Sequence, residues 1–185
     1  MKNTFAESDE YKALHPLHYA AATGDVESIR KQMLGKDVDS LDCDGMTPLQ
    51  KAAEAGHADV VELLVDSGAY IEQRIVMGDE VFGYFWLDGT TPLWLAVKNG
   101  HTDAVGCLLS KGAKTEQRSD PEELTVLMQA MIDGNHEIMR LLVANGASVN
   151  TFMPSGQTVL HWAVIHGDKE SAAILRSHGA KEATA

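Results

Sequence analysis

The sequence lacks a long apolar segment and has few basic residues. Its longest apolar run is far shorter than the roughly 18 residues that a membrane-spanning helix needs, so we predict that the protein makes no membrane contact. The chain begins with a single lysine, continues with acidic residues and has no apolar segment near its start. A secretory signal is therefore not expected, and we predict a cytoplasmic protein.

Catalytic and metal-binding motifs are also missing. The two cysteines, Cys43 and Cys107, lie far apart without the spacing of a metal site, which predicts free thiols in a reducing compartment. The sequence contains no H-E-x-x-H, C-x-x-C, G-x-S-x-G, G-x-G-x-x-G or phosphate-binding loop. We therefore expect no catalytic residues, no cofactor and no metal, and we predict that the protein is not an enzyme.

One segment resembles the first half of a calcium loop. It has Ser40, Asp42 and Asp44 at alternate positions, followed by Gly45. The twelfth position of such a loop needs a bidentate glutamate, and Lys51 stands there instead. Calcium binding is therefore not expected.

Acidic residues greatly outnumber basic ones. Fifteen lysines and arginines stand against 27 aspartates and glutamates, a formal net charge of −12. This charge repels nucleic acids and anionic membranes, so neither is expected as a partner. The negative charge attracts a basic partner. A high net charge also keeps a protein soluble, and this alone is an alternative explanation of the acidic composition.

The chain contains five similar segments with a period close to 33 residues. They begin at positions 15, 47, 91, 125 and 158 and read H-P-L-H-Y-A-A-A-T-G-D, T-P-L-Q-K-A-A-E-A-G-H, T-P-L-W-L-A-V-K-N-G-H, T-V-L-M-Q-A-M-I-D-G-N and T-V-L-H-W-A-V-I-H-G-D. A second amphipathic segment follows each copy and usually ends in Gly-Ala. Each copy therefore predicts a pair of helices.

Helix-capping residues recur at fixed places in these copies. A threonine starts most of them, as expected for an N-cap. Proline takes the first helical position in three of them, and a glycine near the end predicts a left-handed C-cap. The expected caps are Thr47, Thr91, Thr125, Thr158, Pro48, Pro92, Gly56, Gly100, Gly134 and Gly167.

The pattern resembles the ankyrin repeat family, whose signature is T-P-L-H-x-A-A. The resemblance covers about residues 13–182 and implies an all-α solenoid of helix-turn-helix units with hairpin-like finger loops. We expect an extension at 1–12, units at 13–42, 43–74, 87–118, 119–152 and 153–182, an inserted hairpin at 75–86, and a tail at 183–185. Glu123 stands where a turn glycine is expected, which predicts a distorted fourth finger.

The histidines fit structural roles in this framework. His57 and His101 follow the helix-ending glycine and are expected to make local hydrogen bonds, while His18 and His161 take the histidine position of the signature. His15 and His18 lack the further ligands that a metal needs.

The insertion between the second and third copies makes their spacing about eleven residues too long for the repeat. Its sequence, R-I-V-M-G-D-E-V-F-G-Y-F-W, has two β-prone arms around Gly-Asp, which predicts a hairpin. Its aromatic residues predict a binding finger. Alternatively, the hairpin folds back and covers the core of the array.

The family resemblance implies that partners bind the concave face, through finger tips and the ends of first helices. An apolar centre with a charged surround is typical of a protein interface. The candidate partner-binding residues are Asp44, Met46, Glu54, Phe82, Tyr84, Phe85, Trp86, Asp88, Lys98, Glu122, Glu123, Leu124, Ile132, Asp133, Ile165 and His166.

The most specific functional hypothesis is a non-catalytic module that is a monomer when free and binds a basic protein. It acts as an inhibitor of a toxin or an enzyme, for example as an immunity protein. The broader alternative is a cytosolic adaptor or regulatory protein. An enzyme fits the sequence least.

Overall fold

The computed structural model describes residues 9–35, 37–75, 89–119 and 123–181. Within these ranges the chain forms helices joined by turns, without a β-strand; two isolated β-bridges pair Arg118 with Thr125 and Phe152 with Thr158. Residues 76–88, which contain most of the insertion, lie outside the described ranges.

The helices in the described ranges form five consecutive pairs preceded by one short helix. In chain order they are α1 (Asp9–Leu14), α2 (Pro16–Thr23), α3 (Val26–Gln32), α4 (Pro48–Ala55), α5 (Ala58–Asp66), α6 (Pro92–Lys98), α7 (Thr102–Ser110), α8 (Val126–Ile132), α9 (His136–Ala144), α10 (Val159–Ile165) and α11 (Lys169–Ser177).

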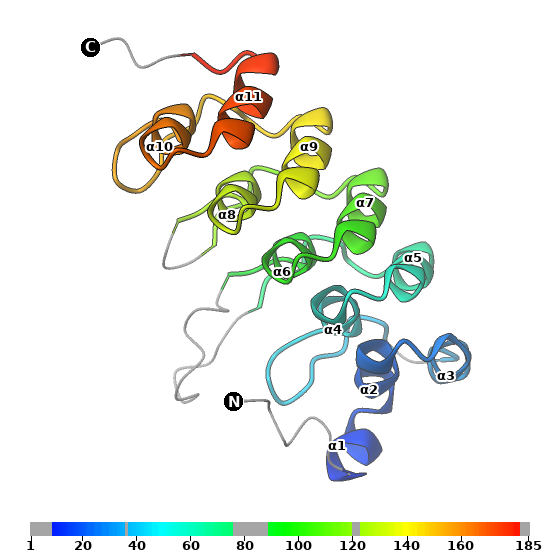
Figure 1. Cartoon of the computed structure of the whole chain (residues 1–185). Coiled ribbons are helices and arrows are strands. Elements are labelled where there is room, and N and C mark those ends of the chain that lie inside the picture. Colours follow the sequence, from blue (N-terminus) through cyan, green and yellow to red (C-terminus); the bar gives the residue numbers. More distant parts are fainter. Residues whose placement is uncertain (1–8, 36, 76–88, 120–122, 182–185) are drawn as a thin grey trace.

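The pairs stack into a curved array of two helix layers. The first helices (α2, α4, α6, α8 and α10) make one layer and the second helices (α3, α5, α7, α9 and α11) make the other, as Figure 1 shows. The loops that lead into α4 and α10 project from the first-helix layer, away from the second helices (Figure 1). This architecture confirms the predicted helical solenoid. In such an array each unit buries its apolar surface only against its neighbours.

Local capping chemistry sets the start of each first helix from α4 onward. The hydroxyls of Thr47, Thr91, Thr125 and Thr158 accept hydrogen bonds from the third backbone N–H of their helices, as predicted. In α4 the Gln50 side chain also accepts from the backbone N–H of Thr47, which completes a reciprocal capping box.

Gly56 ends α4, and two observations explain why a glycine stands there. Its φ of 83° is left-handed, as predicted. A Cβ placed there would also lie 2.5 Å from Nδ1 of His101 in the next unit. Any larger residue would therefore separate neighbouring units.

The core lies between the two layers and runs continuously through all units. Leu49, Leu64, Leu108 and Leu142 are fully buried in it. The i, i+3, i+4 pattern of apolar residues also places Leu63 and Leu141 on the inward face of their helices. Both side chains are only partly buried, because they lie at the edge of that apolar face. Their neighbours Leu64 and Leu142 are the core positions.

Sequence reasoning missed helix α1, because residues 1–12 carry no repeat signature. The helix packs against α2 at the start of the array (Figure 1). Its Tyr11 side chain is almost fully buried. Within the described residues the array therefore has ten helices in pairs, as predicted, plus one more at its N-terminal end.

The fourth finger keeps its turn without glycine. Glu123 has a φ of 53° and is the one non-glycine residue with a left-handed φ in the described ranges. The same turn position holds Gly45, Gly89 and Gly156 in other units. The turn itself is longer than in the finger of the second unit, because the N–H of Glu123 donates to Ser119 four residues back, whereas that of Gly45 donates to Asp42 three residues back. Residues 120–122 lie outside the described ranges.

Candidate protein-binding surface

The fingers share one construction at their base. In each, a backbone N–H before the turn donates to a carbonyl just before the capping threonine: Asp42 to Met46, Ile75 to Thr90, Ser119 to Leu124 and Met153 to Gln157, at 2.8 to 3.1 Å. The side chains of the four donor residues are all buried. Each finger is therefore fixed at its base by the same backbone contact.

Met46 and Leu124 were predicted to contact a partner, and this prediction is wrong. Met46 is 2% exposed and Leu124 is 7% exposed. Both residues follow the left-handed turn position, where the chain comes back toward the helices and directs its next side chain into the core. Thr90 at the same position in the third unit is buried as well.

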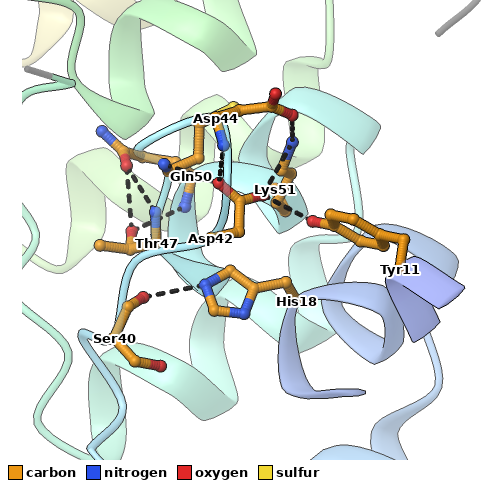
Figure 2. A network of polar contacts seen from close by, with 9 residues as sticks. Tyr11, His18, Ser40, Asp42, Asp44, Thr47, Gln50 and Lys51 are labelled. Carbon is orange, nitrogen blue, oxygen red and sulfur yellow. Dashed lines mark hydrogen bonds and ion pairs between the residues drawn. The ribbon is translucent and has the colours of Figure 1, made fainter. Parts of the chain in front are cut away.

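Asp44 is on a finger, as predicted, but it takes part in an internal ion pair. Its Oδ2 lies 3.1 Å from Nζ of Lys51, which also lies 3.2 Å from Oδ2 of Asp42. Tyr11 donates to the same Asp42 oxygen over 2.5 Å, and Figure 2 shows these groups converging from α1, the finger and α4. Asp44 remains partly exposed, whereas Lys51 and Asp42 are buried.

The charged groups of this network stabilise one another in their ionised forms. Burial opposes ionisation of Asp42, but Lys51 and Tyr11 outweigh it and keep the pKa of Asp42 below its usual value. Burial likewise opposes the charge on Lys51, yet Asp42 and Asp44 raise the pKa of Lys51. Burial and the bond to Asp42 raise the pKa of Tyr11. The network is thus ionised at neutral pH, with Tyr11 as its neutral donor.

Glu54 is the carboxylate of α4 that faces outward near this network. It is partly buried, and burial together with Asp44 and Asp42 raises the pKa of Glu54 despite the opposing effect of Lys51. A partly desolvated carboxylate beside other acids is electrostatically unfavourable. A cation from a partner would relieve this cost.

Residues at one motif position form what we call the helix-end row, two residues before each helix-ending glycine. The row contains Glu54, Lys98, Ile132 and Ile165 at the ends of α4, α6, α8 and α10. Lys98 is exposed, Ile132 is 42% exposed and Ile165 is 52% exposed. The row thus changes along the array from charged to apolar, and its four members are accessible to different degrees.

Two further candidates lie beside this row. Asp133 is exposed and accepts a hydrogen bond from Nε2 of Gln129 over 2.6 Å. His166 is exposed, and its ring stacks on Trp162 at 4.0 Å between ring centroids. We call the fingers and the helix-end row together the finger face.

The insertion begins and ends at the base of the third finger. Ile75 accepts from the backbone N–H of Gly89 over 2.8 Å and donates to Thr90 over 3.1 Å. Arg74 donates to the carbonyl of Gly89, and Nε2 of Gln50 donates to the carbonyls of Gln73 and Thr90. The chain thus leaves and re-enters the array at one point, and α4 holds both ends.

Six of the predicted binding residues lie outside the described ranges: Phe82, Tyr84, Phe85, Trp86, Asp88 and Glu122. Trp94 on α6 is buried. Its indole N–H has no hydrogen-bond partner among the described residues.

His57 and His101 join neighbouring units rather than making local bonds, which corrects the prediction. Nε2 of His57 donates to the carbonyl of Ala22 over 3.2 Å, and Nε2 of His101 donates to that of Glu54 over 2.9 Å. Both carbonyls belong to the first helix of the preceding unit. His18 donates to the carbonyl of Ser40, as Figure 2 shows.

Signs of catalysis or metal binding are lacking in the part of the chain that the structure describes. It contains no group of three or more histidine, cysteine or acidic side chains placed to hold a metal ion. Burial raises the pKa of both Cys43 and Cys107, which is opposite to the shift of a reactive thiol. Across the same ranges, no helix has the length and apolar character needed to cross a membrane.

Sequence reasoning missed Tyr11, Asp42 and Lys51 as a unit. One feature of the sequence could have indicated the ion pair. Lys51 stands on a first helix shortly after two finger aspartates, Asp42 and Asp44. The later units have no cation at its position, where Leu95, Gln129 and Trp162 stand. Nothing in the sequence indicated Tyr11.

The fold and this surface define a repeat solenoid with an exposed row of helix ends and fingers. A family model described as ankyrin repeats (3 copies) matches residues 3–75, 77–152 and 93–184. The chain belongs to the ankyrin repeat family. It is a protein–protein interaction module of a typically non-catalytic fold.

Two relatives place the repeats within longer proteins. The chain is 30% identical over 171 residues to the ankyrin repeat and SAM domain-containing protein 6 of Mus musculus, covering 91% of this chain and 14% of that protein. It is 38% identical over 68 residues to the ARF GTPase-activating protein Git of Drosophila melanogaster, covering 36% of this chain and 9% of that protein. The chain spans only a small part of either relative.

Proposed function

We propose that this chain binds a protein with a basic surface through its finger face. The observation that carries the proposal is Glu54, a partly buried carboxylate whose pKa is raised at an accessible helix end. Such a group costs stability in the free protein, and a cation in a complex removes the cost. Asp133 and Glu123 are exposed on the same face and add to its negative potential.

The insertion is the second part of the proposed surface. Its ends are fixed at the base of a finger by Gln50, Arg74 and the Ile75 backbone. Its sequence includes Phe82, Tyr84, Phe85 and Trp86. Aromatic side chains are common anchors of interfaces, so the proposal assigns the insertion to partner binding.

Stoichiometric inhibition is the role that best suits a compact acidic module of this kind. The target is then a basic enzyme or toxin, and the chain acts as its immunity protein. An adaptor role is the second candidate, favoured by a separate observation: in both relatives the matched repeats are a small part of a longer protein.

Affinity capture from the native source, followed by mass spectrometry, tests the proposal. The immobilised wild-type chain should capture a protein with a basic surface. A variant with Glu54, Glu122, Glu123 and Asp133 changed to Gln or Asn should lose it. The matched control changes Glu27, Asp59, Asp103 and Glu137, which lie in the first turns of second helices, and should retain it. A captured partner that the control variant also loses would contradict the assignment to the finger face.

Deletion of residues 76–85 with a short Gly-Ser link tests the insertion separately. Because Ile75 and Gly89 already lie at one point, helicity should stay nearly unchanged. Affinity for the captured partner should fall strongly, and a single alanine change at an outward aromatic residue should cost about 2–4 kcal/mol. A sharp fall in thermal stability with intact affinity would instead favour a structural cover.

A further inference from the structure

Large apolar side chains are exposed on the C-terminal part of the finger face. Ile132 and Ile165 take equivalent positions at the ends of α8 and α10, where the other units have Glu54 and Lys98. Both isoleucines are exposed. Trp162, three residues before Ile165, lies on the same side of α10 because that spacing is close to one helical turn. We call Ile132, Ile165 and Trp162 the C-terminal apolar strip.

The exposure of the two isoleucines is not an effect of the chain's last unit. Val164 is also exposed, but its counterparts Ala53, Val97 and Met131 are buried by the following unit. Ile165 is different, since its counterpart Ile132 is exposed although a further unit follows it. Ile132 and Ile165 therefore belong to the finger face rather than to the open end of the array. Trp162 is partly exposed at that end, whereas its counterparts Leu95 and Gln129 are buried.

The aromatic end of the strip is held in place. The rings of Trp162 and His166 stack with an angle of 23° between their planes. Nδ1 of His166 lies 2.8 Å from the carbonyl oxygen of Trp162, so the histidine donates from this nitrogen. The His166 ring is therefore held against one face of Trp162 and loses little side-chain freedom when a ligand packs against it, which favours its use as a contact surface.

Charge decides which kind of partner fits the strip. A second copy of this chain would bring another net charge of −12 against the same face and would be repelled. The acidic groups of the same face, Glu54 on α4 and Asp44 on its finger, instead favour a cation. Resting on the proposed function, we infer that the helix-end row binds one extended segment of a basic protein, with Lys or Arg near Glu54 and apolar side chains on the C-terminal apolar strip.

The repeat geometry sets the spacing of that segment. Packed helices lie about 8–10 Å apart, so Glu54 and Ile132 are separated by about two such steps and Ile132 and Ile165 by one. An extended chain advances about 3.3 Å per residue. The segment should therefore carry its first apolar residue about five or six positions from the basic residue, and a second about three positions further on.

Selection from a random library of phage-displayed peptides, about twelve residues long, tests this inference without a known partner. Peptides selected on the wild-type chain should combine Lys or Arg with two apolar residues at this spacing. Selection on the I132Q/I165Q variant should retain Lys and Arg but lose the apolar pair. Glutamine is a good helix former, so the variant should keep its fold, which circular dichroism checks. The control L34Q changes an 81% exposed leucine outside the finger face and should select the same peptides as wild type.

The outcomes separate the two proposals. If peptides selected on I132Q/I165Q still carry the apolar pair, the strip does not bind apolar side chains and this inference is wrong. Selected peptides that are basic but lack apolar residues would also contradict the inference, but they would leave the proposed basic partner intact. Peptides without Lys or Arg, or no enrichment, would contradict both. A dimer of the wild-type chain that I132Q/I165Q abolishes in analytical ultracentrifugation would show that a second copy covers the strip and would also overturn it.

Discussion

The second and third units build the same finger base from opposite chemistries. In the second unit, buried Asp42 starts the finger and buried Lys51 stands on α4 behind it. At the same two positions the third unit has Ile75 and Leu95, both buried. The backbone contacts are equivalent, since Asp42 donates to Met46 as Ile75 donates to Thr90. The fold therefore requires two buried side chains at these positions, and they need not be polar.

The polar pair does something that the apolar pair cannot do. Asp42 accepts a hydrogen bond from Tyr11 and so ties helix α1 to the array. Its other oxygen accepts from the backbone N–H groups of Asp44 and Met46, which orders the finger tip. The apolar pair of the third unit has no such polar links, and there the finger is closed by Gln50 and Arg74 from outside. Asp42, held by Lys51, therefore positions the N-terminal end of the array through Tyr11.

Removing one member of the polar pair should give the largest effect. The K51L variant copies Leu95 but leaves Asp42 buried without its cation, so the free energy of unfolding should fall by about 3–5 kcal/mol. Arg140→Ala breaks the exposed pair with Glu170 and should cost less than about 1 kcal/mol. Chemical denaturation measures both variants.

The double variant D42I/K51L completes the copy of the third unit and sharpens the comparison. It should be more stable than K51L, because the unpaired buried charge is gone. If K51L and D42I/K51L are equally destabilised, the cost comes from packing and the electrostatic account of the second unit is wrong.

Changing the turn of the fourth finger should have an intermediate effect. Glu123 holds a left-handed φ that Gly45 and Gly89 adopt in the second and third units. Glu123→Gly should therefore stabilise the protein by about 1 kcal/mol, whereas Gly45→Ala should destabilise it by a similar amount. Thermal unfolding of the two variants beside wild type measures the difference. A loss of stability in E123G would mean that the Glu123 side chain contributes more than its backbone strain costs.

The smallest effect is expected at the helix ends, where Glu54 of the second unit corresponds to Lys98 of the third. The pKa of Glu54 is raised in the folded chain, so folding favours its protonated form. The contribution of Glu54 to stability should therefore be larger below the ordinary pKa of a glutamate, 4.5, and should be lost as the pH rises through the raised value. Glu54→Gln should stabilise the protein at neutral pH and make no difference well below pH 4.5. Equal stability of E54Q and wild type at every pH would show that Glu54 is not strained.

Much of this structure can be predicted from the sequence, because the same helix-capping residues recur in most repeats. Thr47 and Gly56 each obey a capping rule that needs only neighbouring residues. Met46 and Leu124 were misplaced because the direction of a side chain after a left-handed turn depends on the chain's return to the core. Tyr11 was missed because its hydrogen-bond acceptor, Asp42, is 31 residues away in the sequence, although the two side chains are in contact in the fold. Local chemistry predicts the elements, whereas contacts between units decide which side chains remain free to bind.

The salt dependence of association with the captured partner tests the central claim, that the finger face binds through its charge. The association rate constant should fall as salt rises, more than the dissociation rate constant increases. Neutralising Glu54, Glu122, Glu123 and Asp133 together should weaken this dependence, and neutralising Glu27, Asp59, Asp103 and Glu137 should weaken it less. An association rate constant that stays flat from low to high salt, or an equal effect of the two quadruple variants, would contradict the account and leave the charge with a role in solubility alone.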